Sequence, residues 1–118
     1  MTEIANFTQP DVSPTYFIDF LELLDNLNEI QRVRAEFNNR MNLGFLDKVL
    51  DLGCGIGGPA FPIAEGTGPT GPVAGIDISS AMIEVANRRA RNRPEFAFRI
   101  ADACTFAESD RSWLTGNL

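Results

Sequence analysis

The sequence contains no histidine and only two cysteines, Cys54 and Cys104. A zinc site built from histidines or from several cysteines is therefore excluded, and we expect no metal. The lack of histidine also removes the commonest general base of enzymes. Because the two cysteines have no C-x-x-C spacing, we expect both to be reduced thiols.

The sequence also has no long apolar segment and no excess of positive charge. No stretch approaches the roughly 20 apolar residues of a membrane span, and the start, MTEIANFTQP, lacks the features of a signal peptide. We therefore expect a cytoplasmic protein without a membrane partner. A formal net charge of -6 argues against a nucleic-acid partner. The one basic cluster, Arg88, Arg89, Arg91 and Arg93, lies at a predicted helix end, where cations complement the helix dipole.

The composition fits one globular domain, because 118 residues with 44% hydrophobic and 22% charged side chains are enough for one core.

The N-terminal part of the chain is predicted to be helical. Ser13 and Pro14 are typical of a helix start, as N-cap and first helical residue, and apolar residues then recur at helical spacing. The pattern predicts a second helix over residues 28–42, ended by Gly44, and we expect the apolar stripes of both helices to face a core.

From Lys48 onward, the pattern changes to an alternation of strands and helices. We expect strands at Val49–Leu52, 73–78 and Phe96–Ile100. Between the first two strands we expect a glycine-rich turn at 53–58, a short helix at 59–65 that is limited by Pro62, and a loop at 66–72. Between the last two strands we expect a helix at 79–91. Parallel strands need crossover helices, so this order predicts an α/β fold with a Rossmann-like parallel sheet and helices on both faces. We accordingly divide the chain into a helical segment, 1–44, and a Rossmann-like domain, 45–118.

Residues suited to an adenosine-containing ligand follow each of the three predicted strands. Gly53, Gly55 and Gly57 come after the first strand, Asp77 ends the second, and Asp102 follows the third. The glycines let the backbone turn tightly and approach a ligand, and the next helix start offers N–H groups to an anion. An acidic side chain at the end of the second strand can accept hydrogen bonds from both ribose hydroxyls.

The glycine pattern alone leaves two cofactors open. Gly53, Gly55 and Gly58 also satisfy G-x-G-x-x-G, with Asp77 at the distance expected for a dinucleotide site. Asp51 favours the other reading, because a carboxylate beside a pyrophosphate costs energy whereas a cationic amine is attracted to it. S-adenosylmethionine carries such an amine next to a carboxylate. A fragment of an NAD-dependent oxidoreductase remains the alternative.

Three segments resemble, in order and spacing, the motifs of class I S-adenosylmethionine-dependent methyltransferases: VLDLGCGIGG at 49–58, GIDISSAMI at 75–83 and ADA at 101–103. The similarity extends over about residues 41–106 and is strongest to the small-molecule enzymes related to ubiquinone and menaquinone biosynthesis. It implies S-adenosylmethionine as the cofactor and a small-molecule methyl acceptor.

The resemblance also implies a role for individual residues. Asp51, Gly53, Gly55 and Gly57 would hold the methionine end, and Asp77 would hold the ribose hydroxyls. Ile78 and Met82 would cover the adenine faces, and Asp102 with the Ala103 amide would bind the adenine edge. Each has a structural alternative: a plain tight turn for the glycines, strand-end caps for the later two aspartates, and core packing for the two apolar residues.

The sequence departs from the family at its end. There the family continues with an acidic loop and a fourth strand, whereas ESDRSW at 108–113 only begins to resemble that loop. We therefore expect a sheet truncated after the third strand, a chain inactive on its own, and no assignable catalytic base; a non-catalytic cofactor-binding module is an alternative. The free edge of Val49–Leu52 then predicts a homodimer paired through this edge, or else an aggregated or partly folded chain, rather than a stable monomer.

Overall fold

The centre of the fold is a parallel β-sheet. The computed structural model describes residues 13–44, 47–66, 72–106 and 108–117. Within these ranges the sheet has three strands in the order β1-β2-β3, namely β1 (Val49–Leu52), β2 (Val73–Asp77) and β3 (Phe96–Ile100). The predicted Rossmann-like parallel arrangement is confirmed. β2 ends one residue earlier than predicted, because the Ser79 N–H bonds back to Asp77 and turns the chain away from the sheet.

The connections between the strands are helices, as parallel pairing requires. α3 (Ala60–Gly66) joins β1 to β2, and α4 (Ser80–Arg89) joins β2 to β3. Ser79 caps α4 by accepting a hydrogen bond from the Met82 N–H. α3 has only 7 residues. Pro62 is its third residue, where a backbone N–H would have no acceptor within the helix, so this proline costs little.

An aromatic core lies between the sheet and these two helices. The ring centroid of Phe61 is 4.6 Å from that of Phe96 and 6.0 Å from that of Phe98. All three side chains are buried, and such aromatic pairs stabilise by about 0.5–1.5 kcal/mol beyond their buried area. Gly75 in β2 leaves room for them, because a Cβ there would lie 2.7 Å from Cδ1 of Phe98.

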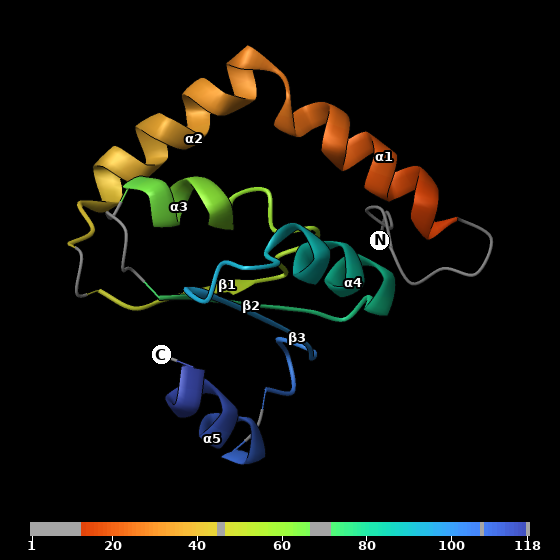
Figure 1. The fold of residues 1–118 in the computed structure, drawn as a ribbon, viewed down its shortest axis with the longest axis vertical. Helices are drawn as coiled ribbons and strands as arrows, with labels where there is room; N and C mark the ends of the chain where they lie inside the picture. The colour runs from red at the N-terminus through yellow and green to blue at the C-terminus, as the bar shows by residue number, and fades with distance from the viewer. Residues whose placement is uncertain (1–12, 45–46, 67–71, 107, 118) are drawn as a thin grey trace.

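The two N-terminal helices form an arch over α3 and α4 (Figure 1). α1 (Pro14–Asp25) begins after Ser13 as predicted, although the Ser13 side chain makes no capping hydrogen bond. α2 (Asn28–Met41) stops earlier than predicted. Asn42 takes the left-handed conformation, φ 51°, so the stop is an asparagine C-cap rather than Gly44. None of the helices in the described ranges is long and apolar enough to cross a membrane.

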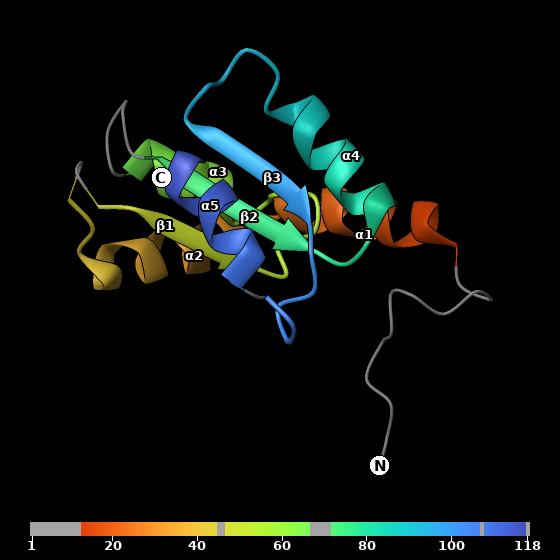
Figure 2. The same cartoon turned by 90° about the horizontal axis from the view of Figure 1, so that it is seen from below.

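The end of the chain differs from the prediction, because residues 108–113 form no loop. They belong to α5 (Glu108–Asn117), which lies on the face of the sheet opposite α3 and α4 (Figures 1 and 2). Arg99 of β3 places its guanidinium carbon 5.6 Å from the centroid of the Trp113 ring. This contact joins α5 to the sheet. The local sequence of residues 108–113 does not predict such a contact between distant residues.

Candidate functional site

The glycine-rich turn after β1 has the tight backbone that the sequence predicts. Gly53, Gly55 and Gly57 have φ values of 73°, 56° and 84°, a region that favours glycine. The turn is bonded to β2, since the N–H groups of Gly53 and Cys54 both donate to the Ile76 carbonyl at 2.8 and 2.9 Å. The positive φ angles therefore bring the turn back over the end of the neighbouring strand.

Asp77 connects this turn to the start of α4. One carboxylate oxygen accepts from the Gly55 N–H and the other from the Ser79 N–H, each at 2.9 Å. Each oxygen keeps a second acceptor position, because an ionised carboxylate offers about four. Asp77 can therefore hold the turn and still receive hydroxyl groups from a ligand.

The residues predicted for the adenine lie at the same edge of the sheet, with different exposures. The Ala101 N–H donates to the Asp77 carbonyl at 3.0 Å, which places Asp102 beside the end of β2. One Asp102 carboxylate oxygen accepts from the Cys104 N–H at 2.8 Å. Ile78 is 53% exposed, whereas Met82 is 2% exposed and packs with the core. Ile78 is thus free to cover a ligand, and Met82 has a packing role whether or not a ligand binds.

A cavity of about 170 Å³ lies above the turn. Four of its lining residues were predicted for the cofactor: Gly53, Gly55, Asp77 and Met82. The remaining predicted residues, Asp51, Gly57, Ile78, Asp102 and Ala103, lie outside its wall. Gly57 is buried, and a Cβ there would lie 2.9 Å from Phe61, so its glycine is required by packing under the turn.

Asp51 lies in β1 and carries a carboxylate oxygen, Oδ2, that is buried without a hydrogen-bond partner. Burial raises the pKa of this carboxyl, the nearby Asp77 charge raises it further, and Arg34 partly opposes both. An unpartnered buried acceptor is costly in the ligand-free chain, and a cationic donor would relieve that cost. Among the described residues, no group of three or more histidines, cysteines or acids is placed to hold a metal ion.

Cys54 sits in the glycine turn but is not a reactive thiol. Burial raises its pKa to about 12, and the charges of Asp51 and Asp77 add to the shift. The thiolate is the reactive form of cysteine, so at neutral pH this side chain behaves as a small apolar group.

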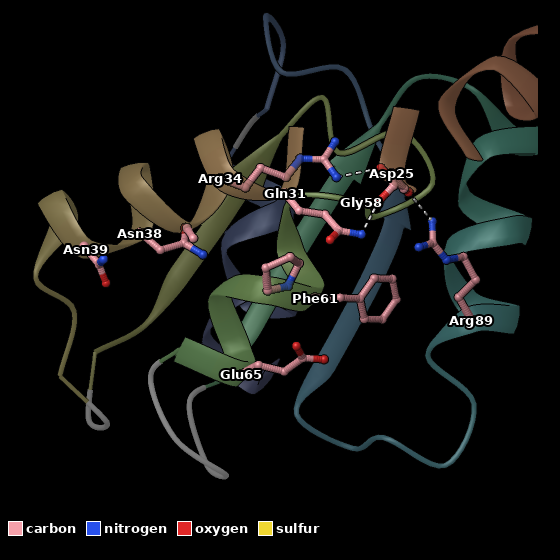
Figure 3. A pocket seen from close by; sticks show the side chains of 11 residues that line it. Asp25, Gln31, Arg34, Asn38, Asn39, Gly58, Phe61, Glu65 and Arg89 are labelled. Atoms are coloured by element: carbon pink, nitrogen blue, oxygen red, sulfur yellow. Dashed lines mark hydrogen bonds and ion pairs between the residues drawn. The ribbon is translucent and has the colours of Figure 1, made fainter. Parts of the chain in front are cut away.

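The N-terminal helices supply part of the cavity that the sequence did not indicate. Leu21 and Asp25 of α1 and Arg34 of α2 line it. Asp25 is the centre of an ion-pair cluster: Arg34 reaches its Oδ1 at 2.6 Å and Arg89 of α4 reaches its Oδ2 at 3.1 Å (Figure 3). Arg89 also donates to the Ile56 carbonyl at 3.0 Å. We call Asp25, Arg34 and Arg89 the Asp25 cluster.

A second, larger cavity of about 450 Å³ lies on the other side of this cluster, between α2 and α3. Asp25, Arg34 and Gly58 line both cavities, so the ion pair lies between them. The larger cavity contains none of the residues predicted for a cofactor. The smaller one holds the glycine turn and Asp77 and is therefore the better candidate for the functional site.

Comparison with known proteins agrees with this geometry. Residues 46–112 match a family model described as a methyltransferase domain. The chain belongs to this methyltransferase family. The motif resemblance noted in the sequence is thereby confirmed, and the turn and Asp77 lie within the matched residues.

Relatives of this methyltransferase domain include two bacterial methyltransferases, one of them named for a small molecule. It is 35% identical over 86 residues to the methyltransferase GfsG of Streptomyces halstedii, covering 70% of this chain and 30% of that protein. It is 29% identical over 105 residues to the demethylmenaquinone methyltransferase of Lactobacillus johnsonii, covering 86% of this chain and 42% of that protein. The chain thus spans less than half the length of these relatives.

Solved methyltransferase structures show the same arrangement. A geranyl diphosphate methyltransferase in complex with GPP and sinefungin superposes with a TM-score of 0.55 at 29% identity, covering 63% of this chain and 29% of that chain.

Proposed function

We propose that this chain carries the S-adenosylmethionine-binding part of a methyltransferase that acts on a small molecule. Three features support the proposal: the match to the methyltransferase domain, the cavity above the glycine turn, and the buried Asp51 Oδ2 without a hydrogen-bond partner in the strand that leads into the turn. The last feature carries the most weight, because it fits a ligand with a cationic amine and disfavours the pyrophosphate of NAD. When bound, the sulfonium of S-adenosylmethionine supplies the methyl group.

The exposures suggest how the ligand would divide between the cavity and the open surface. A cavity of about 170 Å³ is smaller than the roughly 300–1,000 Å³ of typical ligand pockets. Only the methionine end and the ribose would therefore enter it, next to Asp51 and Asp77. The adenine would lie outside, over exposed Ile78 and beside Asp102 and Ala103.

The chemical class of the methyl acceptor is proposed from the relatives of this chain. The relatives are longer, and the name of one of them specifies a small organic acceptor, demethylmenaquinone. We propose an acceptor of this class. Tyr16 is 67% exposed and lines neither cavity, so it is not assigned as a catalytic base. Because the chain spans less than half the length of these relatives, we expect it to bind the cofactor without turnover on its own. Its cytoplasmic location stays a prediction.

Calorimetry with S-adenosylhomocysteine tests the site. Asp77→Ala is expected to weaken binding by about 1–3 kcal/mol, because ribose hydroxyls lose their acceptor. Asp77 also holds the turn, so the decisive comparison uses the 2′,3′-dideoxy analogue of the same ligand.

Wild type should prefer the hydroxylated ligand by about the amount that the variant loses, and Asp77→Ala should not distinguish the two ligands. Asp47→Ala, a change at an exposed aspartate in the loop before β1, is the control. Undiminished discrimination by Asp77→Ala would show that another group receives the ribose. Tighter binding of NAD than of S-adenosylhomocysteine would favour the oxidoreductase alternative.

A further inference from the structure

Most of the N–H groups of the glycine turn are already used inside the fold. Gly53 and Cys54 donate to the Ile76 carbonyl, Gly55 to the Asp77 carboxylate, and Gly57 to the Cys54 carbonyl. The first two N–H groups of α3, those of Ala60 and Phe61, both donate to the Gly57 carbonyl. A ligand carboxylate entering the cavity therefore cannot rely on these six donors.

A cation is nevertheless present in the cavity wall. Arg34 lines the cavity together with Gly53, Gly55 and Asp77. Its side chain is 22% exposed and holds Asp25 through Nη1 at 2.6 Å. A guanidinium has five N–H donors in a planar fork, so one ion pair leaves donors for a second carboxylate.

The two charges that an amino-acid end requires are thus an arginine in the cavity wall and an aspartate in the strand before the glycine turn. Asp51 offers a buried acceptor without a partner, and Arg34 is close enough to Asp51 to act on its charge. A free amino-acid group is a zwitterion, whose ammonium needs an acceptor and whose carboxylate needs donors. Asp51 would accept hydrogen bonds from the ammonium, and Arg34 would donate hydrogen bonds to the carboxylate.

We propose that Arg34 binds the carboxylate of the cofactor's methionine end and that Asp25 and Arg89 position it. The inference rests on the proposed function. Asp25 fixes Arg34 through one oxygen, and Arg89 balances Asp25 through the other while bonding to the Ile56 carbonyl of the turn (Figure 3). The cluster therefore aligns α2 with the turn and keeps the guanidinium at the cavity wall.

Two ligands distinguish this role from a purely structural one. S-adenosylhomocysteine carries the amino-acid end, and 5′-methylthioadenosine lacks it. Arg34→Gln is expected to weaken binding of S-adenosylhomocysteine by about tenfold to a hundredfold and to leave binding of 5′-methylthioadenosine nearly unchanged. Arg34→Lys should restore part of the loss, because it keeps the charge without the fork.

Arg40→Gln is the matched control, since Arg40 is an exposed arginine on the same helix whose ion pair is with Glu36, four residues away. It should bind both ligands like wild type. Equal weakening of both ligands by Arg34→Gln, or weakening of neither, would overturn the inference and leave the proposed function standing. Failure of wild type to bind either ligand would overturn both.

If Arg34→Gln does not fold, the wild-type chain still provides a test. Decarboxylated S-adenosylhomocysteine keeps the amine and lacks the carboxylate. The proposal requires wild type to bind it at least about tenfold more weakly than the parent ligand. Equal affinity for the two would refute a cationic partner for the carboxylate.

Discussion

At the scale of single residues, Asp51 shows how a binding group can oppose folding. The folded chain raises its pKa above the ordinary value of 3.8, chiefly by burial. Folding therefore shifts the protonation equilibrium of this side chain toward the neutral carboxyl, relative to the unfolded chain. Its contribution to stability is complete below pH 3.8 and is lost as the pH rises through the raised pKa.

Asp51→Asn should accordingly stabilise the ligand-free chain at pH 7, raising its melting temperature by a few degrees, because a neutral amide replaces a buried carboxylate. The gain should shrink as the pH falls toward 4. The same variant should bind S-adenosylhomocysteine more weakly. Thermal melts between pH 4 and 8 measure the first effect, with Asp19→Asn, at an exposed site on α1, as the control. Identical pH profiles for wild type and Asp51→Asn would contradict the prediction.

The sequence indicated some site residues and could not indicate others. The three glycines with positive φ and Asp77 belong to local patterns, in which spacing along the chain reflects spacing around a tight turn. Their roles toward a cofactor stay predictions. The Asp25 cluster joins residues 9 and 64 positions apart, so no local pattern marks it. Arg89 was assigned only to the dipole of its helix, whereas in the structure it also pairs with Asp25.

At the scale of elements, the strands were predictable because each is a short apolar run bounded by glycine, proline or a charged residue. β1 and β3 have the predicted bounds, and the helices begin within one residue of prediction. α5 was missed because its sequence has little helical periodicity. Its position depends on contact with the sheet through Arg99 and Trp113.

The contact between α1 and the glycine turn depends on Gly58, a glycine that does not have a positive φ angle. A Cβ on Gly58 would overlap the carboxylate of Asp25, which two arginines hold in place. Gly58→Ala should therefore displace the end of α1 and destabilise the chain by about 1–3 kcal/mol. Urea unfolding measures this loss.

The control for this prediction is Gly116→Ala in α5. A Cβ on Gly116 would meet nothing within 4 Å, so alanine should be neutral or stabilise the helix by up to about 1 kcal/mol. Equal stability of Gly58→Ala and wild type would mean that Asp25 can move without cost, and that the Asp25 cluster does not fix α1.

At the scale of the whole molecule, the described chain forms layers around the sheet. The arch of α1 and α2 lies above α3 and α4, and α5 lies beneath the sheet (Figure 1). Both outer strands keep an open edge within the described ranges. β3 carries Arg99, a charge that discourages pairing with another strand, whereas β1 has no lysine, proline or bulge.

The open edge of β1 predicts self-association of the chain. Val49 and Gly53 donate to the Pro72 and Ile76 carbonyls, so by alternation the N–H groups of Leu50 and Leu52 point outward. We expect light scattering to find a dimer at high concentration, with these two amides protected from exchange.

Leu52 is 58% exposed, so Leu52→Lys can place a charge at this edge without disturbing the core, and it should restore a monomer. Ile100→Lys makes the same change at the end of β3, where the side chain is 52% exposed, and should leave the dimer intact. A dimer broken by the β3 change alone would move the interface to the other edge. A wild-type monomer at every concentration, with the Leu50 and Leu52 amides strongly protected, would mean that another part of the chain already covers β1.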